Sequence, residues 1–501
     1  MKPLFPLFIA AVLAVAGCSS SKRIAEDRSQ AATVNHVQIP MVRGDNLVMS
    51  IALPAGIVDE LQLDVKGLDT QVLESAYLYA GETVLATAEP GPKGKVVFKN
   101  VEQGGGVNVA IRLGGNLDLY SPVAISVSKI KVGGKKLTVV DEDNALHHGA
   151  LVIRTFGDDG VNSYRIPGLV TTKKGTLVGS FDIRRRNSAD LQGDIDVGVM
   201  RSTDGGRTWG PMIVAMDMGE YGGLGQEFNG IGDPCILVDE VTGDLLLFAA
   251  WVNGDIGTAW WNAKDGFEIG CTPQLMMARS TDDGLTWSEP ENLTRQIKQE
   301  AWNFTFQGPG RGITMADGTL VVPFQHQEPD RTPAAGIMYS MDRGKTWNVY
   351  NYAKINTTES QVAEIAPGKL LLAIRDNRGK ARAMYVTENL GKTWDPYDCD
   401  GVLPDPVCMG SIIHVNAADN ALGRDLVLFS NPASPSDRNN ITIRASFDGG
   451  KTWPSSVLLD EGYGWGYSCL TMVDKSHVGI LYESSVGNMT FQVVDISELL
   501  P

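Results

Sequence analysis

The sequence lacks three features that would point to common classes of protein. It has no Cys-x-x-Cys pair among its six cysteines, so no zinc site is suggested. It has no excess of positive charge, and the formal net charge of -16 argues against nucleic acid or acidic lipid as the general partner, because the averaged field repels phosphates. Its N-terminal apolar stretch, from Leu4 to Ala16, is too short for a transmembrane helix.

The first residues instead predict export followed by lipid attachment. Lys2 precedes the short apolar stretch, as in a signal peptide. The segment Val15-Ala16-Gly17-Cys18 resembles a bacterial lipobox, in which Cys18 becomes the lipidated first residue, and the serines at 19–21 suit a tether. An ordinary signal peptide with an incidental cysteine is the alternative. We expect a lipoprotein signal peptide at 1–17, a tether at 18–32, and a lipid-anchored protein of the bacterial cell envelope, on the periplasmic face or the cell surface.

Residues 33–148 are expected to form a β-sandwich. Runs such as 107–111 and 124–128 alternate apolar and polar residues, which is typical of half-buried strands, and glycine-rich turns separate them. The polar segment 141–148 is the expected linker. The five cysteines after Cys18 are expected to be buried small hydrophobes, with a bridge between Cys399 and Cys408 as the alternative.

An internal repeat marks residues 149–501. The pattern Ser-x-Asp-x-Gly-x-Thr-Trp occurs at 202–209, 280–287, 340–347 and 446–453, and a divergent copy at 387–394 has Asn389 at the Asp position. Successive copies start 47 to 78 residues apart, about one four-stranded propeller blade each. The Asp side chain can hydrogen-bond the turn while the Gly takes a left-handed conformation. The predicted fold is all-β, a six-bladed β-propeller preceded by the β-sandwich.

Candidate functional residues lie between these repeats. The segment Tyr164-Arg165-Ile166-Pro167 opens the propeller, and an arginine run followed by spaced carboxylates occupies 182–196. A Glu-x-Gln-x-x-Glu strand at 359–364 leads through an apolar strand to Arg375. The remaining candidates lie around the final repeat and are Arg438, Tyr467 and Glu483.

These motifs, in this order from about residue 150 to 495, resemble those of bacterial exo-sialidases with Asp-box propellers. The resemblance implies an exo-α-sialidase that removes terminal sialic acids from glycoproteins, glycolipids and oligosaccharides, with no metal or organic cofactor. It assigns Asp190 as general acid/base, Glu359 as the base for the nucleophile, and Tyr467 as the nucleophile. It also assigns Arg165, Arg375 and Arg438 to the substrate carboxylate, Arg184 to the pocket near the ring hydroxyls, and Glu483 to the orientation of Arg165.

The chemistry explains the pairing of Glu359 with Tyr467. Sialic acid carries its carboxylate on the anomeric carbon, so a carboxylate nucleophile would approach against a like charge, whereas a neutral phenol does not. A free phenol has a pKa near 10, so Tyr467 needs a base within hydrogen-bond reach. Three guanidinium groups offer bidentate, charge-assisted bonds to the substrate carboxylate.

Alternatives remain at several positions. Arg185 or Arg186 could replace Arg184, and Tyr463 is the nearest rival of Tyr467. The same residues could transfer the sugar to another acceptor or form an intramolecular product. A non-catalytic Asp-box propeller is the rival class, although a binding protein has no use for the Glu and Tyr pair. The sandwich resembles accessory domains that bind carbohydrate, and a packing or spacer role is equally compatible with it.

Overall fold

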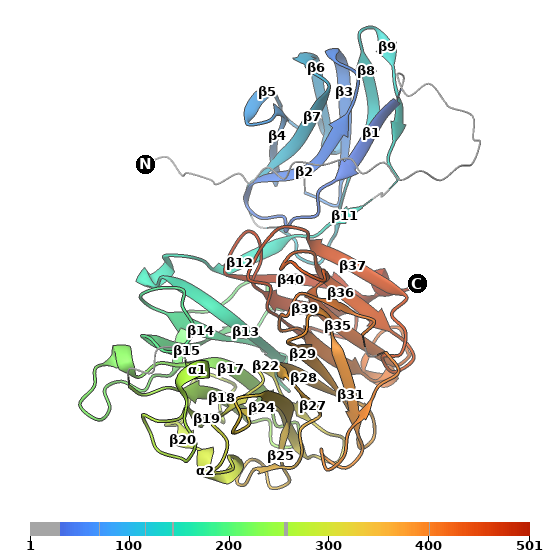
Figure 1. Ribbon diagram of the computed structural model, residues 1–501. Helices are drawn as coiled ribbons and strands as arrows, with labels where there is room; N and C mark the ends of the chain where they lie inside the picture. Colours follow the sequence, from blue (N-terminus) through green and yellow to red (C-terminus); the bar gives the residue numbers. More distant parts are fainter. Residues whose placement is uncertain (1–30, 70, 116, 143–144, 255–258, 400) are drawn as a thin grey trace.

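The chain folds into a β-sandwich followed by a larger ring of sheets (Figure 1). The structure is a computed structural model that describes every residue except 1–30, 70, 116, 143–144, 255–258 and 400. The predicted signal peptide, the lipidation site Cys18 and all but the last two residues of the tether therefore lie outside the described residues. Within the described ranges, neither short helix has the length and hydropathy of a membrane span. These are α1 (Ala259–Asn262) and α2 (Thr294–Ile297).

Two sheets form the sandwich. The first has the order β10-β1-β2-β7-β4-β5, and the second has the order β11-β8-β3-β6 with β9 paired to β8. The strands of the first are β1 (Ala31–His36), β2 (Gly44–Ala52), β4 (Leu73–Ala80), β5 (Thr83–Ala88), β7 (Gly106–Leu113) and β10 (Thr138–Val140). Those of the second are β3 (Gly56–Lys66), β6 (Lys95–Gln103), β8 (Val123–Val132), β9 (Lys135–Lys136) and β11 (Leu146–His147).

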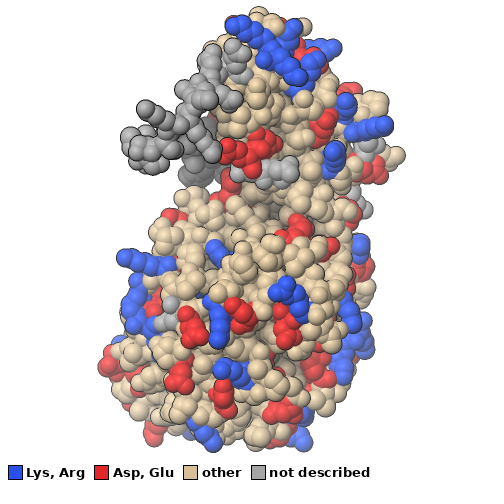
Figure 2. Space-filling model, turned by 90° about the vertical axis from the view of Figure 1, so that its right-hand side faces the viewer, with Lys and Arg blue, Asp and Glu red and all other residues tan. Residues whose placement is uncertain are grey.

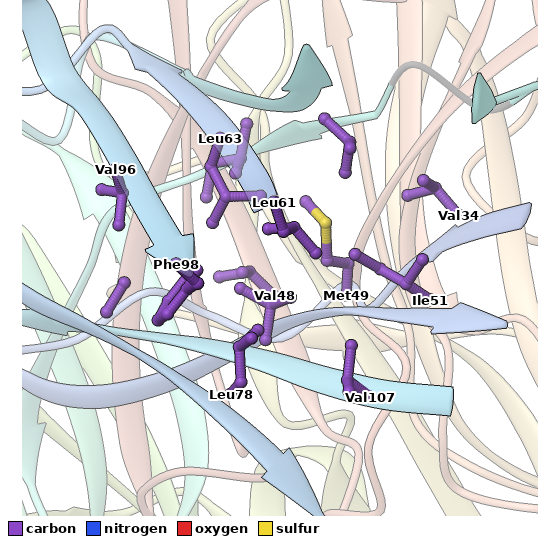
Figure 3. Close-up of a cluster of buried hydrophobic side chains, with 14 of the residues drawn as sticks. Val34, Val48, Met49, Ile51, Leu61, Leu63, Leu78, Val96, Phe98 and Val107 are labelled. Atoms are coloured by element: carbon purple, nitrogen blue, oxygen red, sulfur yellow. The ribbon is translucent and has the colours of Figure 1, made fainter. Parts of the chain in front are cut away.

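The alternating residues of these strands build one apolar core between the two sheets (Figure 3). Leu61 and Leu63 on β3 and Phe98 on β6 point toward Val48 and Leu78 of the facing sheet, and all are buried. Period-two burial is what a strand with one solvated face requires. The sandwich thus has a hydrophobic core of its own.

The propeller region contains six sheets of four or more strands in the described residues. Two of them are β13-β14-β15-β16, with strands at Ser163–Thr171, Leu177–Arg184, Ile195–Ser202 and Ile213–Met216, and β34-β35-β36-β37, with strands at Ser411–Val415, Leu426–Pro432, Ile441–Ser446 and Ser455–Asp460. A third is β28-β29-β31-β32, with strands at Thr357–Ala366, Lys369–Asp376, Ala383–Thr387 and Asp395–Pro396. A two-stranded sheet pairs β30 (Lys380–Ala381) with β33 (Pro404–Asp405).

Two further sheets carry additional strands. One is β20-β19-β18-β17-β22, with strands at Glu291–Asn292, Gln274–Ser280, Leu245–Trp251, Ile231–Val238 and Gly310–Arg311. The other contains β21 (Phe304–Gln307), β23 (Ile313–Thr314), β24 (Leu320–Gln327), β25 (Pro333–Ser340), β26 (Asn348–Val349) and β27 (Lys354–Ile355).

The last sheet joins the two ends of the propeller region. β12 (Ala150–Arg154) pairs with β40 (Met489–Asp495), which continues through β39 (His477–Tyr482) to β38 (Ser468–Met472). A strand from the start of the region therefore completes a sheet made at its end, which joins the two ends of the ring. The prediction of an all-β fold with a β-propeller is confirmed.

The repeated segments form one kind of turn. In the first copy Asp204 accepts hydrogen bonds from the backbone N–H and the hydroxyl of Thr208, at 2.9 and 2.6 Å, and Gly206 has a φ of +87°. Trp209 packs edge-on against Phe491 of β40, in the neighbouring sheet. The repeats thus fix turns and connect sheets, and none of them contains a candidate catalytic residue.

The sandwich contacts the propeller through specific polar and aromatic groups. The hydroxyl of Tyr120 donates to the carbonyl oxygen of Gly205 at 2.7 Å, and the guanidinium of Arg207 lies 3.9 Å from the centre of the Tyr120 ring. The backbone N–H of Glu461 donates to the carbonyl oxygen of Gln38 at 2.7 Å. Tyr120 is therefore part of the junction and not an open stacking surface.

Four of the five cysteines after Cys18 are buried as expected, whereas Cys271 is half-buried. The thiols of Cys408 and Cys469 also donate to the carbonyl oxygens of Trp465 and Leu169, both at 3.7 Å. Cys408 carries a free, buried thiol, so the disulfide with Cys399 that the sequence left open does not form. Burial raises the pKa of the Cys408 thiol to about 12, which keeps it protonated at neutral pH.

Candidate active site

The predicted site residues meet at one end of the propeller strands. Arg165 is the third residue of β13 and Glu359 the third of β28, while Tyr467 directly precedes β38. Arg375 reaches the same end because β29 runs antiparallel to β28, and Glu483 directly follows β39, which is antiparallel to β38. Antiparallel pairing thus gathers residues that are far apart in the sequence.

The opposite ends of the inner strands surround a different space. A cavity of about 390 Å³ is lined there by Thr171 of β13, Glu364 of β28 and Met472 of β38, among others. None of the predicted site residues borders it. The predicted catalytic and binding residues therefore lie at the other end of the strands from this cavity.

Tyr467, Glu359 and Arg375 form a closed triangle of hydrogen bonds. The Tyr467 hydroxyl donates to Glu359 Oε1 at 2.5 Å, and Arg375 Nη1 donates to Glu359 Oε2 at 2.6 Å and to the Tyr467 oxygen at 2.8 Å. Tyr467 is only 5% exposed. Burial, followed by the negative charge of Glu359, raises the pKa of Tyr467 well above its ordinary value despite the nearby Arg375. The phenol therefore keeps its proton until a base removes it.

Glu483 fixes the position of Arg165 and of the Tyr467 backbone. Its Oε1 accepts from Arg165 Nε at 2.6 Å and from the backbone N–H of Ile166 at 2.9 Å, and its Oε2 accepts from the backbone N–H of Tyr467 at 3.0 Å. Ile166 has a φ of +63°, an unusual conformation for a β-branched residue. A buried carboxylate with three donors holds its neighbours tightly, because losing any of them leaves charge unsatisfied.

Arg438 completes a group of three arginines around Tyr467. It donates to the carbonyl oxygens of Trp465 at 3.0 Å and Val407 at 3.3 Å, and its guanidinium carbon lies 5.6 Å from the centre of the Tyr467 ring. The Arg165 guanidinium carbon lies at the same 5.6 Å from that ring. The structure thus brings together the three arginines that the resemblance assigned to one carboxylate.

Asp190 is hydrogen-bonded to Arg184. Arg184 Nη1 donates to Asp190 Oδ1 at 2.8 Å, and its Nε and Nη2 donate to Asp182 Oδ2 at 3.1 and 2.9 Å. The Asp190 side chain is 68% exposed, whereas the Arg184 side chain is 1% exposed. Partial burial raises the pKa of Asp190, but Arg184, Arg165 and Arg375 outweigh it and leave the pKa lowered.

The rival residues have different surroundings. Arg185 pairs with Asp196 at 2.5 Å, and Arg186 pairs with Asp194 at 3.2 Å, so Arg184 is the arginine of the run that contacts Asp190. Tyr463 is 68% exposed, and the hydrogen bond to Glu359 comes from Tyr467. The geometry therefore favours the residues named from the motifs.

Comparisons with known proteins identify the family of the chain. A family model described as a BNR repeat-like domain matches residues 187–480. A sialidase from Bacteroides fragilis (strain YCH46) is 46% identical over 495 residues, which cover 95% of this chain and 91% of that protein. The chain belongs to the sialidase family. A sialidase from Micromonospora viridifaciens is 32% identical over 375 residues, covering 73% of this chain and 55% of that protein.

The sialidase also resembles a solved relative over nearly its whole length. The structure of the Hadza microbial sialidase Hz136 matches with a TM-score of 0.86 and 43% identity, covering 93% of this chain and 100% of that one. This chain is an exo-α-sialidase, a glycoside hydrolase that hydrolyses terminal sialic acid. In the described residues, no group of His, Cys, Asp and Glu has the arrangement of a metal site.

Two residues of the sialidase site were missed by the sequence analysis. Asp233, at a φ of +58°, donates its backbone N–H to Asp182 Oδ1 at 2.8 Å, and burial together with the charges of Asp182 and Asp190 raises its pKa well above the ordinary value. Trp465 stacks its ring 4.2 Å from the Arg165 guanidinium carbon. The aromatic next to the Tyr467 motif was a usable signal for Trp465, whereas no local pattern distinguishes Asp233.

Proposed function

We propose that this sialidase acts by a retaining double displacement through a glycosyl-Tyr467 intermediate. The observation that carries the proposal is the 2.5 Å hydrogen bond from the Tyr467 hydroxyl to Glu359, with Arg375 bound to both oxygens. A phenol with a raised pKa attacks only if its proton leaves during the attack, and Glu359 is within reach to accept it. Arg375 then stabilises negative charge on either oxygen.

In the first step Arg165, Arg375 and Arg438 bind the substrate carboxylate and place the anomeric carbon against Tyr467. The Tyr467 oxygen bonds to that carbon while its proton passes to Glu359. The bond to the leaving oxygen breaks, and Asp190 supplies a proton to that oxygen. In the second step Asp190 takes a proton from water, the water oxygen bonds to the anomeric carbon, and Tyr467 leaves and recovers its proton.

Asp190 must be protonated to act in the first step, although its pKa is lowered in the free protein. Its exposed side chain is free to turn from Arg184 toward the leaving oxygen, and a bound sugar would shield it from water. Both changes raise the pKa of a carboxyl group. We infer that substrate binding raises the pKa of Asp190 and so allows it to act as the acid. The proposed substrates are the terminal sialic acids of glycoproteins, glycolipids and oligosaccharides.

The stereochemistry of the first product tests the mechanism. Two displacements on opposite faces return the starting configuration, so proton NMR in the first minutes of hydrolysis should detect α-sialic acid before the β-anomer formed by mutarotation. If the β-anomer appears first, water attacks directly and Tyr467 is not the nucleophile. If the main product is an intramolecular ether or a sugar transferred to another acceptor, the second step is not hydrolysis.

We also propose that the enzyme is lipid-anchored in the bacterial envelope through Cys18. The support is the sequence at 15–18, which resembles a lipobox. Fractionation of cells expressing the full chain should place the activity with membranes, and Cys18→Ser should move it to the soluble fraction. Activity that stays soluble with Cys18 intact would favour an ordinary signal peptide.

A further inference from the structure

Lysines gather at one end of the sandwich, although the chain as a whole is acidic. Figure 2 shows positively charged side chains clustered at the end of the sandwich farthest from the propeller. The second sheet supplies them, and all are exposed or half-buried. The lysine tip, as we call this cluster, consists of Lys99 of β6, Lys129 and Lys131 of β8, and Lys135 and Lys136 of β9.

The acidic groups of the same sheet do not neutralise the lysine tip. Glu60 accepts from Lys129 Nζ at 2.6 Å, and that bond, with smaller contributions from Lys99 and Lys131, lowers the pKa of Glu60. Asp59 accepts the backbone N–H of Gly134 at 2.7 Å. The third carboxylate nearby is Glu102, which lies opposite Ile57 on β3. Five lysines therefore face three carboxylates.

Two lysines of the tip oppose each other directly. The register of β8 and β9 pairs Lys131 with Lys136, and like charges at directly opposite positions destabilise a sheet. In the described part of the chain neither of them forms an ion pair within the molecule. Such a pair is unfavourable in isolation and becomes favourable when an external anion lies against it.

The lysine tip lies where the chain enters the sandwich. β1 and β10 run parallel, with Ala31 beside Thr138, and Lys136 comes two residues before Thr138. Both strands run toward the propeller, because His36 at the end of β1 contacts His147 at 3.4 Å, and His147, the last residue of β11, lies three residues before the first propeller strand, β12. Ala31 and the lysine tip are therefore at the same, far end.

This placement connects the tip with the predicted lipid anchor. Cys18 precedes Ala31 by 13 residues, so the two residues lie at most about 45 Å apart, the length of a fully extended chain. A lipid on Cys18 would thus hold the far end of the sandwich near the bilayer. The averaged charge of the molecule disfavours acidic lipid, but screening limits that effect to about 8 Å, so a local cluster decides the contact.

We propose that the lysine tip docks on the anionic headgroups of the membrane that holds the lipidated Cys18. The inference rests on the proposed lipid anchor, and it gives the sandwich a role as a spacer. β3 spans 11 residues, about 35 Å at strand rise, and this length separates the propeller from the bilayer. The site at Tyr467 is then carried clear of the headgroups, where large sialylated substrates have access.

Vesicle binding tests the docking separately from lipidation. The mature chain from residue 18, carrying Cys18→Ser so that it cannot receive a lipid, is sedimented with vesicles of phosphatidylcholine alone or with about one third phosphatidylglycerol. We expect binding only to the anionic vesicles, and weaker binding at high salt. The triple variant Lys99→Glu, Lys135→Glu, Lys136→Glu should weaken it on the order of 100-fold, since each lysine near an anionic surface contributes roughly fivefold.

A matched control reverses three exposed lysines of the propeller, Lys174→Glu, Lys345→Glu and Lys451→Glu, and should leave vesicle binding within a few-fold of the parent. The triple tip variant should keep the parental melting temperature within a few degrees, because its three side chains are exposed and Lys136→Glu removes the like-charge pair with Lys131. Lost binding would then not reflect unfolding. Equal binding to neutral vesicles, or equal losses in both triple variants, would overturn the proposal. So would an unchanged affinity of the tip variant for vesicles together with weaker binding to a sialylated mucin, which would make the tip a substrate-docking surface.

Hydrolysis of a small sialoside should be the same in all variants, so loss of that activity would bear on the proposed mechanism and not on docking.

Discussion

Tyr467 and Asp190, the proposed nucleophile and the proposed acid, are held in different ways. Tyr467 is buried, its hydroxyl lies between Glu359 and Arg375, and its backbone N–H is bound by Glu483. Asp190 lies in the segment between β14 and β15, its side chain is 68% exposed, and Arg184 is the partner that holds it. One half of the site is a closed network on strand ends. The other is a loop residue that, among the residues the structure describes, is hydrogen-bonded to Arg184 alone.

The difference fits what each residue is proposed to do. A nucleophile must meet the anomeric carbon at one geometry, and preorganised donors lower the barrier without reorganisation. The acid must serve leaving groups of varied shape and later activate water, so a side chain that can move suits both steps. The comparison predicts that changes in the buried half abolish the reaction, while changes in the exposed half depend on the substrate.

The largest effect is expected for Tyr467→Phe. Because the nucleophilic oxygen is gone, kcat/KM for α2,3-sialyllactose should fall by about 10⁴-fold or more. The arginines remain, so calorimetry with an unsaturated sialic acid analogue should give a Kd within a few-fold of the parent. Near-normal turnover of sialyllactose by this variant would show that Tyr467 is not the nucleophile, and the comparison with Asp190 would not hold.

The two halves also differed in how far the sequence predicted them. Arg165, Glu359, Arg375, Tyr467 and Glu483 all lie in motifs, and the structure brings them together because each motif occupies a strand end, whose place in a propeller is set by pairing. The neighbours of the acid were harder to predict, since their roles come from burial and backbone conformation.

Asp182 and Asp233 illustrate this limit. Asp182 was visible in the arginine-rich segment but its part in holding Arg184 was not, and Asp233 contributes through a backbone N–H at positive φ. In the sandwich, alternation predicted the strands but not the contact that Tyr120 makes with the propeller. The partner of Tyr120, Gly205, lies 85 residues away, a contact that no local pattern encodes.

A substrate-dependent effect is expected for Asp190→Asn. An amide cannot donate a proton to a sugar oxygen, so kcat/KM for sialyllactose should drop by roughly 10²- to 10⁴-fold. A nitrophenyl leaving group departs as a stable anion, so the same variant should hydrolyse a nitrophenyl sialoside within about tenfold of the parent. Equal losses on the two substrates would mean that Asp190 does more than supply the proton.

Arg438→Ala should have a moderate effect on binding. Among the described residues its guanidinium donates to two backbone carbonyls and to no side chain, so its removal frees no buried carboxylate there. Losing one charge-assisted bond, about 1.5–3 kcal/mol, should raise the inhibition constant of a carboxylate-bearing analogue by roughly 10- to 150-fold. Arg295→Ala, at a position that is 69% exposed, is the control and should change nothing. An unchanged inhibition constant for Arg438→Ala would show that the carboxylate lies elsewhere.

The smallest effect concerns the support of the acid half. Burial raises the pKa of Asp182 to about 6, with Arg184 and the Asp233 N–H acting in the opposite direction. A carboxyl group whose pKa is higher in the folded than in the unfolded protein, where it is near 3.9, stabilises the fold at low pH and loses that contribution as the pH rises through the folded value. The free energy of unfolding should therefore decline between about pH 4 and pH 6, by at most about 3 kcal/mol from this group.

Asp182→Asn does not titrate, so its apparent melting temperature should fall less steeply than that of the parent across this pH window, by a few degrees. The slope is the measurement, because removing one partner of the buried pair with Arg184 lowers stability at every pH. Asp398→Asn, at a side chain that is 73% exposed, should keep the parental slope. If Asp182→Asn keeps it as well, Asp182 is ionised throughout. Arg184 would then be paired with two carboxylates that stay ionised, those of Asp182 and Asp190, and the acid would be held as firmly as the nucleophile.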